Sequence, residues 1–246
     1  MPIKQSYIYS VRSYHTDANG QLFIHQLLNF LQDAAHQHAD GLGFGQIQLM
    51  PHNFFWVLSR LSIEISGMPE SGDELVLSTW VKSHRGSVSE REFSISINNK
   101  DTVKASSLWF CLSGDSHRPT KLPEVYSRLM KARDKHAVAG GTQKVREPDA
   151  DFQGSAGITT YAVNSDIDMA KHVNNATYVR WLIDELPPEF LQAKKLSRLD
   201  INYLGECFLG EEVFSKHFHQ AENDFIHVSR NRLTGKVLLR AFSQWK

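Results

Sequence analysis

The strongest constraint on the fold is that this chain of 246 residues repeats itself. An apolar segment with helical spacing, "LLNFLQDAA", begins at Leu27, and a similar segment, "YVRWLIDEL", begins 151 residues later at Tyr178. Further along, "SRLSI" at Ser59 recurs as "SRLDI" at Ser197, and "ASSLW" at Ala105 recurs as "AFSQW" near the end of the chain. Three matching blocks in the same order predict a tandem duplication of one structural unit.

Both halves have the same predicted order of elements. A short strand leads into a turn that contains Asp17 in the first half and Asp168 in the second, and an amphipathic helix follows. The segments after each helix alternate apolar and polar residues, which is typical of strands with one buried face. This order predicts an α+β fold in which each half is an antiparallel sheet wrapped around one helix. The apolar stripe of the first helix consists of Leu27, Leu28, Phe30, Leu31, Ala34 and Ala35.

The duplication predicts two domains and a connection between them. We expect residues 1–123 and 157–246 to form the domains, with residues 124–156 as a linker because this segment is rich in charge and glycine. The segment "PEVYSRLMKARDKH" within it is compatible with a short helix.

Composition excludes several classes of function. The formal net charge is zero and the sequence pI is about 7.2, so nothing favours nucleic acid or an anionic membrane as a partner. The two cysteines, Cys111 and Cys207, fit neither a disulfide framework nor a zinc site. We see neither a signal peptide nor an apolar run long enough to span a membrane, and we therefore expect a cytoplasmic protein.

The two halves differ in their polar residues. The segment "SDIDMAKHVNN" begins at Ser165, and within it His172 aligns with Gln21 of the first half. Under the offset of the strand block, Glu206 aligns with Met68. Groups that only stabilised the fold would be needed in both copies. We therefore expect the second half to carry the chemistry and the first half to be structural or to bind substrate.

At this point the chain resembles a known family. The string "DMAKHVNNATYVRW", followed by "NYLGEC", is similar to that of the acyl-acyl carrier protein thioesterases, which are tandem hot-dog enzymes of plants and bacteria. In the first half, "NFLQDAAHQHADGLGFG", "FWVLSRLSIEI" and "RPTKLPE" agree with the same family. The resemblance implies two hot-dog domains, no cofactor, and a first half that houses the acyl chain.

The resemblance also implies site residues. The family's pattern has an Asp, an Asn and a His before "VNN", and a later Glu-Cys pair. Ala170 stands at the place of the Asn, so we expect Asn174 or a backbone N–H group to take its role. The matching catalytic candidates in this chain are Asp168, His172, Glu206 and Cys207.

The chemistry of thioester hydrolysis suits these residue types. An imidazole such as that of His172 titrates near neutral pH, and it can activate water or protonate a leaving thiol. Glu206 lies among apolar residues, and partial burial would make it a plausible general base. On an alternating strand Cys207 would face away from Glu206, which makes Glu206 the better catalytic candidate. Asp168 is either a nucleophile or simply a cap of the following helix, and the first backbone N–H groups of that helix suit an oxyanion.

The sequence therefore predicts a hydrolase that releases fatty acids from acyl carrier protein, without a metal or cofactor. His36 and His38 lie two residues apart on a helix and so face different sides, which does not suit a metal site. An acyl-CoA thioesterase, a hot-dog hydroxyacyl dehydratase and a non-catalytic acyl-binding protein remain alternatives. We expect a monomer whose two halves mimic a dimer, or else a homodimer.

Overall fold

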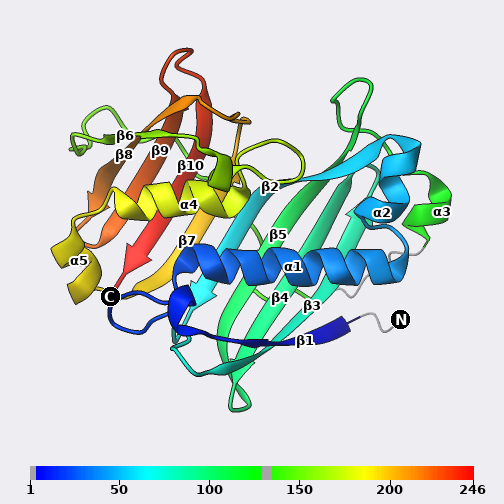
Figure 1. The fold of residues 1–246 in the computed structure, drawn as a ribbon, viewed down its shortest axis with the longest axis horizontal. Helices are drawn as coiled ribbons and strands as arrows, with labels where there is room; N and C mark the ends of the chain where they lie inside the picture. The colour runs from blue at the N-terminus through cyan, green and yellow to red at the C-terminus, as the bar shows by residue number, and fades with distance from the viewer. Residues whose placement is uncertain (1–3, 129–134) are drawn as a thin grey trace. The chain divides into compact units, whose positions relative to one another are not determined.

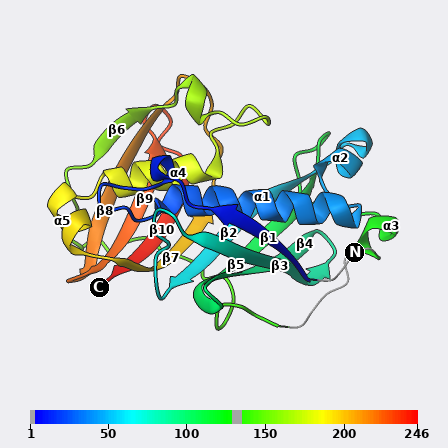
Figure 2. The same ribbon diagram turned by 60° about the horizontal axis from the view of Figure 1, so that its bottom comes forward.

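The first half contains one five-stranded antiparallel sheet. The computed structural model describes residues 4–128 and 135–246. The strand order in the first half is β1-β3-β4-β5-β2, and helix α1 (Ile24–Leu42) lies along one face of these strands (Figures 1 and 2). The strands are β1 (Lys4–Ser10), β2 (Phe54–Ile65), β3 (Glu74–Arg85), β4 (Val88–Ile97) and β5 (Lys100–Ser113).

The second half repeats this arrangement. Its strand order is β6-β8-β9-β10-β7, with helix α4 (Asn175–Asp184) along one face. Each strand therefore has the same neighbours as its counterpart in the first half, and all the pairs are antiparallel. The predicted duplication and α+β class are confirmed. The strands are β6 (Ile158–Tyr161), β7 (Leu196–Tyr203), β8 (Glu212–Ala221), β9 (Asp224–Asn231) and β10 (Val237–Trp245).

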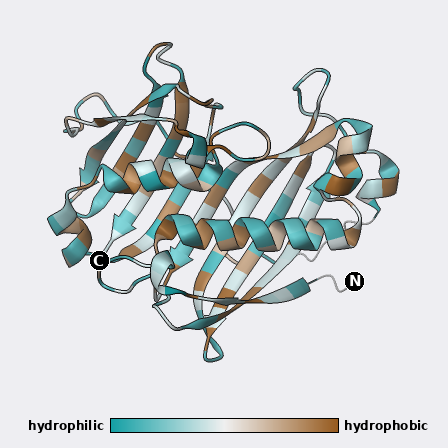
Figure 3. Ribbon diagram, in the orientation of Figure 1, coloured by the Kyte–Doolittle hydropathy of each residue, from teal (hydrophilic) through white to brown (hydrophobic). Residues whose placement is uncertain are grey.

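Helix α1 buries the predicted apolar stripe against its sheet. Hydrophobic and hydrophilic segments alternate along the helix in Figure 3, as expected for a helix with one buried face. Phe30 lies at the margin of the stripe, half-buried, and stacks on Tyr9 of β1 with ring centres 4.9 Å apart. The fully buried members of the stripe are Leu27 and Ala34, with Leu28, Leu31 and Ala35 nearly so.

No helix in the described parts of the chain is long and apolar enough to cross a membrane.

The short elements complete the chain. They are α2 (Gln46–Leu49), α3 (Glu124–Ser127) and α5 (Pro188–Ala193), with 3₁₀ turns at Ser13–His15, Met50–His52 and Asn164–Asp166. Helix α3 confirms a short helix at the start of "PEVYSRLMKARDKH", but residues 129–134 of this segment lie outside the described residues. The described residues form two compact units that divide near residue 142.

The described part of the linker is attached to the sheets rather than loose. Trp80 Nε1 donates to the carbonyl oxygen of Lys135 at 3.0 Å, and the N–H of Ala137 donates to the buried Glu92 at 2.7 Å. Within the second unit, Asn202 accepts from the N–H of Val145 and donates to the carbonyl oxygen of Gln143, both at 2.9 Å. Buried side chains of each sheet thus fix the path of the linker by satisfying its backbone groups.

Candidate active site

A tight turn brings the chain from β6 to the start of α4. One carboxylate oxygen of Asp168, Oδ1, accepts hydrogen bonds from the N–H groups of Ala170 at 2.8 Å and His172 at 3.4 Å. The N–H of Asp168 donates to the carbonyl oxygen of His172 at 2.9 Å. Lys171 closes the turn in the left-handed region, with φ at 66°. The turn therefore fixes the backbone on both sides of the His172 side chain.

The first half contains the same turn, bond for bond. Oδ1 of Asp17 accepts from the N–H groups of Asn19 and Gln21, both at 2.9 Å. The N–H of Asp17 donates to the carbonyl oxygen of Gln21 at 2.8 Å, and Gly20 takes the left-handed conformation of Lys171, with φ at 77°. The Asp is thus needed in both copies to satisfy the backbone. Among the described residues Asp168 Oδ2 makes no hydrogen bond, so this oxygen alone is available for chemistry.

Three positions around the second-half turn carry groups that the first half lacks. His172 stands in place of Gln21 and Glu206 in place of Met68, as the sequence analysis noted. The third is Asn174, already a candidate for the role of the missing amide: it is the N-cap of α4, whereas the N-cap of α1 is Phe23, a difference between the halves that the sequence analysis did not draw. The offset of 151 residues already aligned these two residues, so the signal was present in the sequence.

His172 and Glu206 come together in the structure. Nδ1 of His172 lies 3.8 Å from Oε1 of Glu206, which is ion-pair distance when the imidazole is protonated but longer than a hydrogen bond. The two side chains are 32% and 49% exposed, so substrate can reach both. The ring of Phe208 packs edge-on against the imidazole with centres 5.1 Å apart. The expected partial burial of Glu206 is not seen, and His172 is the titratable side chain beside it.

The strand expected at Glu206 and Cys207 is not present. Strand β7 ends at Tyr203, because the N–H groups of Leu204 and Gly205 both turn to the carbonyl oxygen of Leu238 and the ladder stops there. The two side chains still point to opposite sides, since Glu206 is exposed and Cys207 is fully buried. The connection after β7, rather than strand alternation, produces this difference.

The position of Cys207 argues against a nucleophilic thiolate. Burial raises the pKa of the Cys207 thiol to about 12, and a hydrogen bond to Glu211 together with its negative charge adds to the effect. The carbonyl oxygen of Cys207 accepts the N–H of Val173 at 2.9 Å, and that of Pro69 accepts the N–H of Leu22 in the same way in the first half. Cys207 therefore links the loop after β7 to the turn, as Pro69 does in the other copy.

The start of α4 offers donors for a developing negative charge. The side-chain oxygen of Asn174 accepts a hydrogen bond from the N–H of Ala176 at 2.8 Å, and its backbone carbonyl oxygen accepts one from the N–H of Thr177 at 2.9 Å. The N–H of Asn175 has no partner among the described residues, so one free backbone donor remains where several were expected. The Asn174 amide nitrogen is a second donor, because only its oxygen is used in the cap.

A further acidic residue lies beneath the turn. Asp166, which was not among the catalytic candidates, is 2% exposed, and its carboxylate pairs with Arg180 of α4 at 2.5 Å. Its burial keeps it away from any substrate.

No other described feature competes as a reactive centre. Among the described residues no cluster of three or more His, Cys, Asp or Glu side chains could hold a metal ion. His36 is exposed, whereas His38 is buried and accepts a hydrogen bond from Arg91 at 2.8 Å, so the two face different sides as predicted.

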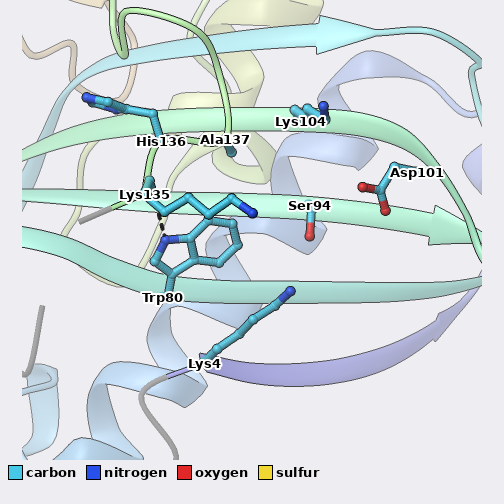
Figure 4. Close-up of a pocket in the computed structure, with 8 residues that line it drawn as sticks. All are labelled: Lys4, Trp80, Ser94, Asp101, Lys104, Lys135, His136 and Ala137. Carbon is cyan, nitrogen blue, oxygen red and sulfur yellow. Dashed lines mark hydrogen bonds between the residues drawn. The ribbon is translucent and has the colours of Figure 1, made fainter. Parts of the chain in front are cut away.

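A separate pocket of about 190 Å³ lies in the first half (Figure 4). It opens on the face of the sheet away from α1, since Trp80 pairs in register with Glu92, whereas the neighbouring Arg91 points to His38 of the helix. The ammonium group of Lys4 lies 5.1 Å from the centre of the Trp80 ring. None of the catalytic candidates lines this pocket, whose walls are Lys4, Trp80, Ser94, Asp101, Lys104, Lys135, His136 and Ala137.

Comparison with known proteins gives a family match in both halves. The acyl-ACP thioesterase N-terminal domain matches residues 3–129, and the acyl-ACP thioesterase C-terminal domain matches residues 154–246. A palmitoyl-acyl carrier protein thioesterase of the chloroplast from Arabidopsis thaliana is 28% identical over 217 residues, which cover 81% of this chain and 51% of that protein. The chain spans about half the length of the curated relatives it matches.

Solved structures agree in fold. An acyl-ACP thioesterase from Bacteroides thetaiotaomicron is 27% identical with a TM-score of 0.86, and the match covers 99% of this chain and 98% of that one. A 12:0-ACP thioesterase from Umbellularia californica is 21% identical with a TM-score of 0.85, covering 100% of this chain and 98% of that one. These matches confirm the tandem hot-dog fold that the sequence predicted.

Proposed function

The chain belongs to the acyl-ACP thioesterase family, and from this premise we propose that it hydrolyses the thioester of acyl-acyl carrier protein to release a free fatty acid. The observation that supports this most is the asymmetry of the duplicated turn. An equivalent set of hydrogen bonds holds the turn with His172 and Asn174 in one half and the turn with Gln21 and Phe23 in the other. Glu206 and Met68 are the matched residues of the segment that contacts each turn. The titratable pair has no counterpart in the first half, which fits a single hydrolytic site in the second.

In the proposed mechanism His172 and Glu206 act as a pair. A water molecule attacks the thioester carbon while its proton passes to the imidazole of His172, and the nearby Glu206 carboxylate stabilises the imidazolium that forms. The free oxygen of Asp168, Oδ2, orients the water. The carbon–sulfur bond then breaks, and His172 returns the proton to the departing thiolate, which leaves a carboxylic acid and the free thiol of the carrier.

The developing oxyanion requires donors, and the start of α4 supplies them in this proposal. The N–H of Asn175 and the amide nitrogen of Asn174 belong to the N-terminus of α4, which is the positive end of the helix dipole. Removal of one such donor in enzymes typically lowers kcat by about 10²–10³. Asn174 thereby replaces the amide that is absent at Ala170.

We assign the acyl chain to the first half. Residues 1–123 form its domain, residues 124–156 the linker and residues 157–246 the catalytic domain in this proposal. The support is that the first half keeps the helix-on-sheet layer but has an apolar Phe23 and Met68 where the second half has polar groups.

The hairpin segment "KSHRGSVSERE" has basic residues that could contact an acidic carrier, but its structure is less basic than its sequence. Lys82 pairs with Glu90 at 2.8 Å, and Arg91 is buried against His38. Burial also lowers the pKa of His84, which favours its neutral form. This hairpin therefore gives little support for a carrier contact, and the carrier itself remains the proposed partner on the strength of the family.

The cellular location and the oligomeric state of the protein are proposals as well. We propose a cytoplasmic protein from its composition alone, whereas the plant relatives carry names that place them in chloroplasts. A monomer is the proposed state, since a tandem repeat can supply within one chain the pair of domains that a dimer of single domains would provide.

The test is product analysis with a matched set of substrates. Purified protein is incubated with acyl-carrier thioesters of 8 to about 18 carbons, the same acyl groups on CoA, and a 3-hydroxyacyl-carrier thioester. We expect free fatty acid and carrier thiol from the first set, with no release by a His172→Ala, Glu206→Ala double variant. Faster hydrolysis of the CoA esters would indicate an acyl-CoA thioesterase. Water elimination from the hydroxyacyl substrate would indicate a dehydratase, and tight binding without turnover a non-catalytic protein.

A further inference from the structure

A single buried residue ties three parts of the catalytic half together. Asp166 Oδ2 accepts the N–H of Val163 at 3.0 Å, and Oδ1 accepts Arg180 Nη2 at 2.5 Å. Its carbonyl oxygen accepts the N–H of Asn174 at 2.8 Å. The end of the strand segment, the N-cap of α4 and the second turn of that helix all meet at Asp166.

The first half makes the backbone part of this arrangement without the ion pair. His15 stands at the matched place, and its Nδ1 accepts the N–H of Arg12 at 3.1 Å. Its carbonyl oxygen accepts the N–H of Phe23 at 3.0 Å, as that of Asp166 does for Asn174. The residue matched to Arg180 is Asn29. Among the residues that the structure describes, the turn of the first half thus has no carboxylate–guanidinium pair.

The ion pair is therefore not required by the fold of the turn. The Asp166 side chain is 3% exposed and the Arg180 side chain 40%, so desolvation of the carboxylate offsets much of the attraction and the pair contributes little net stability compared with well-packed neutral residues. Its contribution is directional, because a charge-assisted hydrogen bond fixes distance and angle more tightly than an apolar contact. It occurs in the half whose turn presents His172 and whose helix start presents the Asn175 N–H.

We propose that Asp166 and Arg180 are positioning residues, which hold the His172 turn against the start of α4 at the spacing that hydrolysis requires. This rests on the function proposed above. Asp166 is 2% exposed and cannot touch substrate, so the pair acts through the backbone of Asn174 and the turn before it. His172 lies two residues before Asn174 and the Asn175 N–H one residue after it, so one link controls both groups.

Four variants test this. Arg180→Met removes the guanidinium but keeps the length of the side chain, and Arg180→Lys keeps a charge. The double variant Asp166→Asn, Arg180→Met replaces the pair by neutral groups, which protects the fold from an unpaired buried charge. Asn29→Met introduces the same side chain at the matched position of α1.

The measurements are kcat and KM with an acyl-carrier thioester, the thermal midpoint, and the ring NMR signals of His172 across pH. We expect kcat to fall by about 10- to 100-fold in Arg180→Met and in the double variant, the range that a displacement of about 1 Å produces. KM should change by less than about threefold, since substrate contacts remain. Arg180→Lys should recover much of the loss, and Asn29→Met should leave kcat unchanged.

Two results would overturn the proposal. One is a double variant with wild-type kcat. The other is an Arg180→Met variant whose loss of activity matches only its unfolded fraction, with unchanged His172 ring signals. Failure of the proposed function is recognised separately, because wild-type protein would then release no fatty acid. In that case the ring NMR signals of His172 still show whether Asp166 and Arg180 position the turn. A positioning pair must shift these signals in the double variant, and a purely structural pair must not.

Discussion

His172 Nδ1 lies 3.8 Å from Glu206 Oε1, although the two residues are 34 positions apart in the chain. The turn before α4 sets one side chain, and the loop after β7 sets the other. A backbone hydrogen bond joins these two segments, from the N–H of Val173 to the carbonyl oxygen of Cys207 at 2.9 Å. Val173 and Cys207, which have no role in the proposed chemistry, thus help to hold the proposed pair together.

Replacing His172 by Ala should lower kcat by roughly 10²–10⁴, the usual contribution of a positioned acid–base group. The matched variant in the first half, Gln21→Ala, should leave the chemical step nearly unchanged, because its turn has the same backbone bonds without a titratable side chain. Steady-state kinetics and thermal midpoints of both variants check this. Equal losses of stability with no selective loss of hydrolysis would return the turn to a purely structural role.

Glu206→Ala should abolish most turnover, whereas Cys207→Ala should keep most of it. The carboxylate is exposed beside His172, and the thiol is fully buried with its pKa raised to about 12, which leaves little thiolate at neutral pH. Initial rates with an acyl-carrier substrate, at equal folded fraction by circular dichroism, measure both. A folded but inactive Cys207 variant alongside an active Glu206 variant would reverse the assignment.

Restoring the amide by Ala170→Asn should leave kcat nearly unchanged when Asn174 is present and should raise it when Asn174 is replaced by Ala, because we propose that Asn174 already fills the role of the amide. Ala170 lies within the turn, its N–H donates to Asp168 at 2.8 Å, and the position is exposed, so a larger side chain fits without repacking. The comparison is kcat for this variant with and without Asn174→Ala. If Asn174 already fills the role, Ala170→Asn alone should not raise kcat, and Ala170→Asn should restore the kcat that Asn174→Ala lowers. A lower kcat in both Ala170→Asn variants would contradict a catalytic amide at this position.

Hydrolysis should be insensitive to chelators. The described residues contain no cluster of metal-binding side chains, and the mechanism assigns every proton transfer to His172. The measurement is turnover before and after dialysis against EDTA. Lost activity that one divalent ion restores would show that the mechanism is incomplete.

Acid should destabilise the second half through His227. Burial, together with the charge of the neighbouring His217, lowers the pKa of His227 to about 3, whereas an unfolded His titrates near 6.5. The unfolded state therefore binds more protons between these values, and this contribution to stability is present above about pH 6.5 and is lost as pH falls toward 3.

The test is His227→Phe, which copies the first half. Phe93 occupies the matched place there, since it pairs with Thr79 on β3 as His227 pairs with His217 on β8. Between pH 7 and pH 5 the wild type should lose on the order of 2 kcal/mol more free energy of unfolding than the variant. Urea unfolding at the two pH values measures the difference, and parallel losses would rule out His227 as the cause.

The sequence predicted the architecture well because the pattern was doubled. Periodicity that is ambiguous in one segment becomes convincing when it recurs in the same order. Strands follow the helix in each half as predicted, although β7 ends at Tyr203, before Glu206 and Cys207. The candidate pair of His172 and Glu206 also followed from the comparison of the halves, and the two side chains do meet.

Side-chain environments were harder to predict. Glu206 was expected to be partly buried on a strand, but the ladder ends at Tyr203 and leaves it exposed. Apolar neighbours in sequence, such as Leu204 and Phe208, do not bury a residue when they are themselves exposed to solvent. The partnership of Asp166 with Arg180 depends on the depth of the turn beneath α4, which no local pattern encodes.

The matched turns show that the Asp that fixes the backbone is shared, whereas the side chains that the turn presents differ between the halves. Asp17 and Asp168 hold the same backbone, so either copy can exchange its reactive side chains without a single change in chain path. The division of labour that we propose between the halves therefore needs only substitutions at positions on this shared turn. The halves differ in length elsewhere, because the offset between matched residues changes from 151 at the turn to 138 at the next strand block.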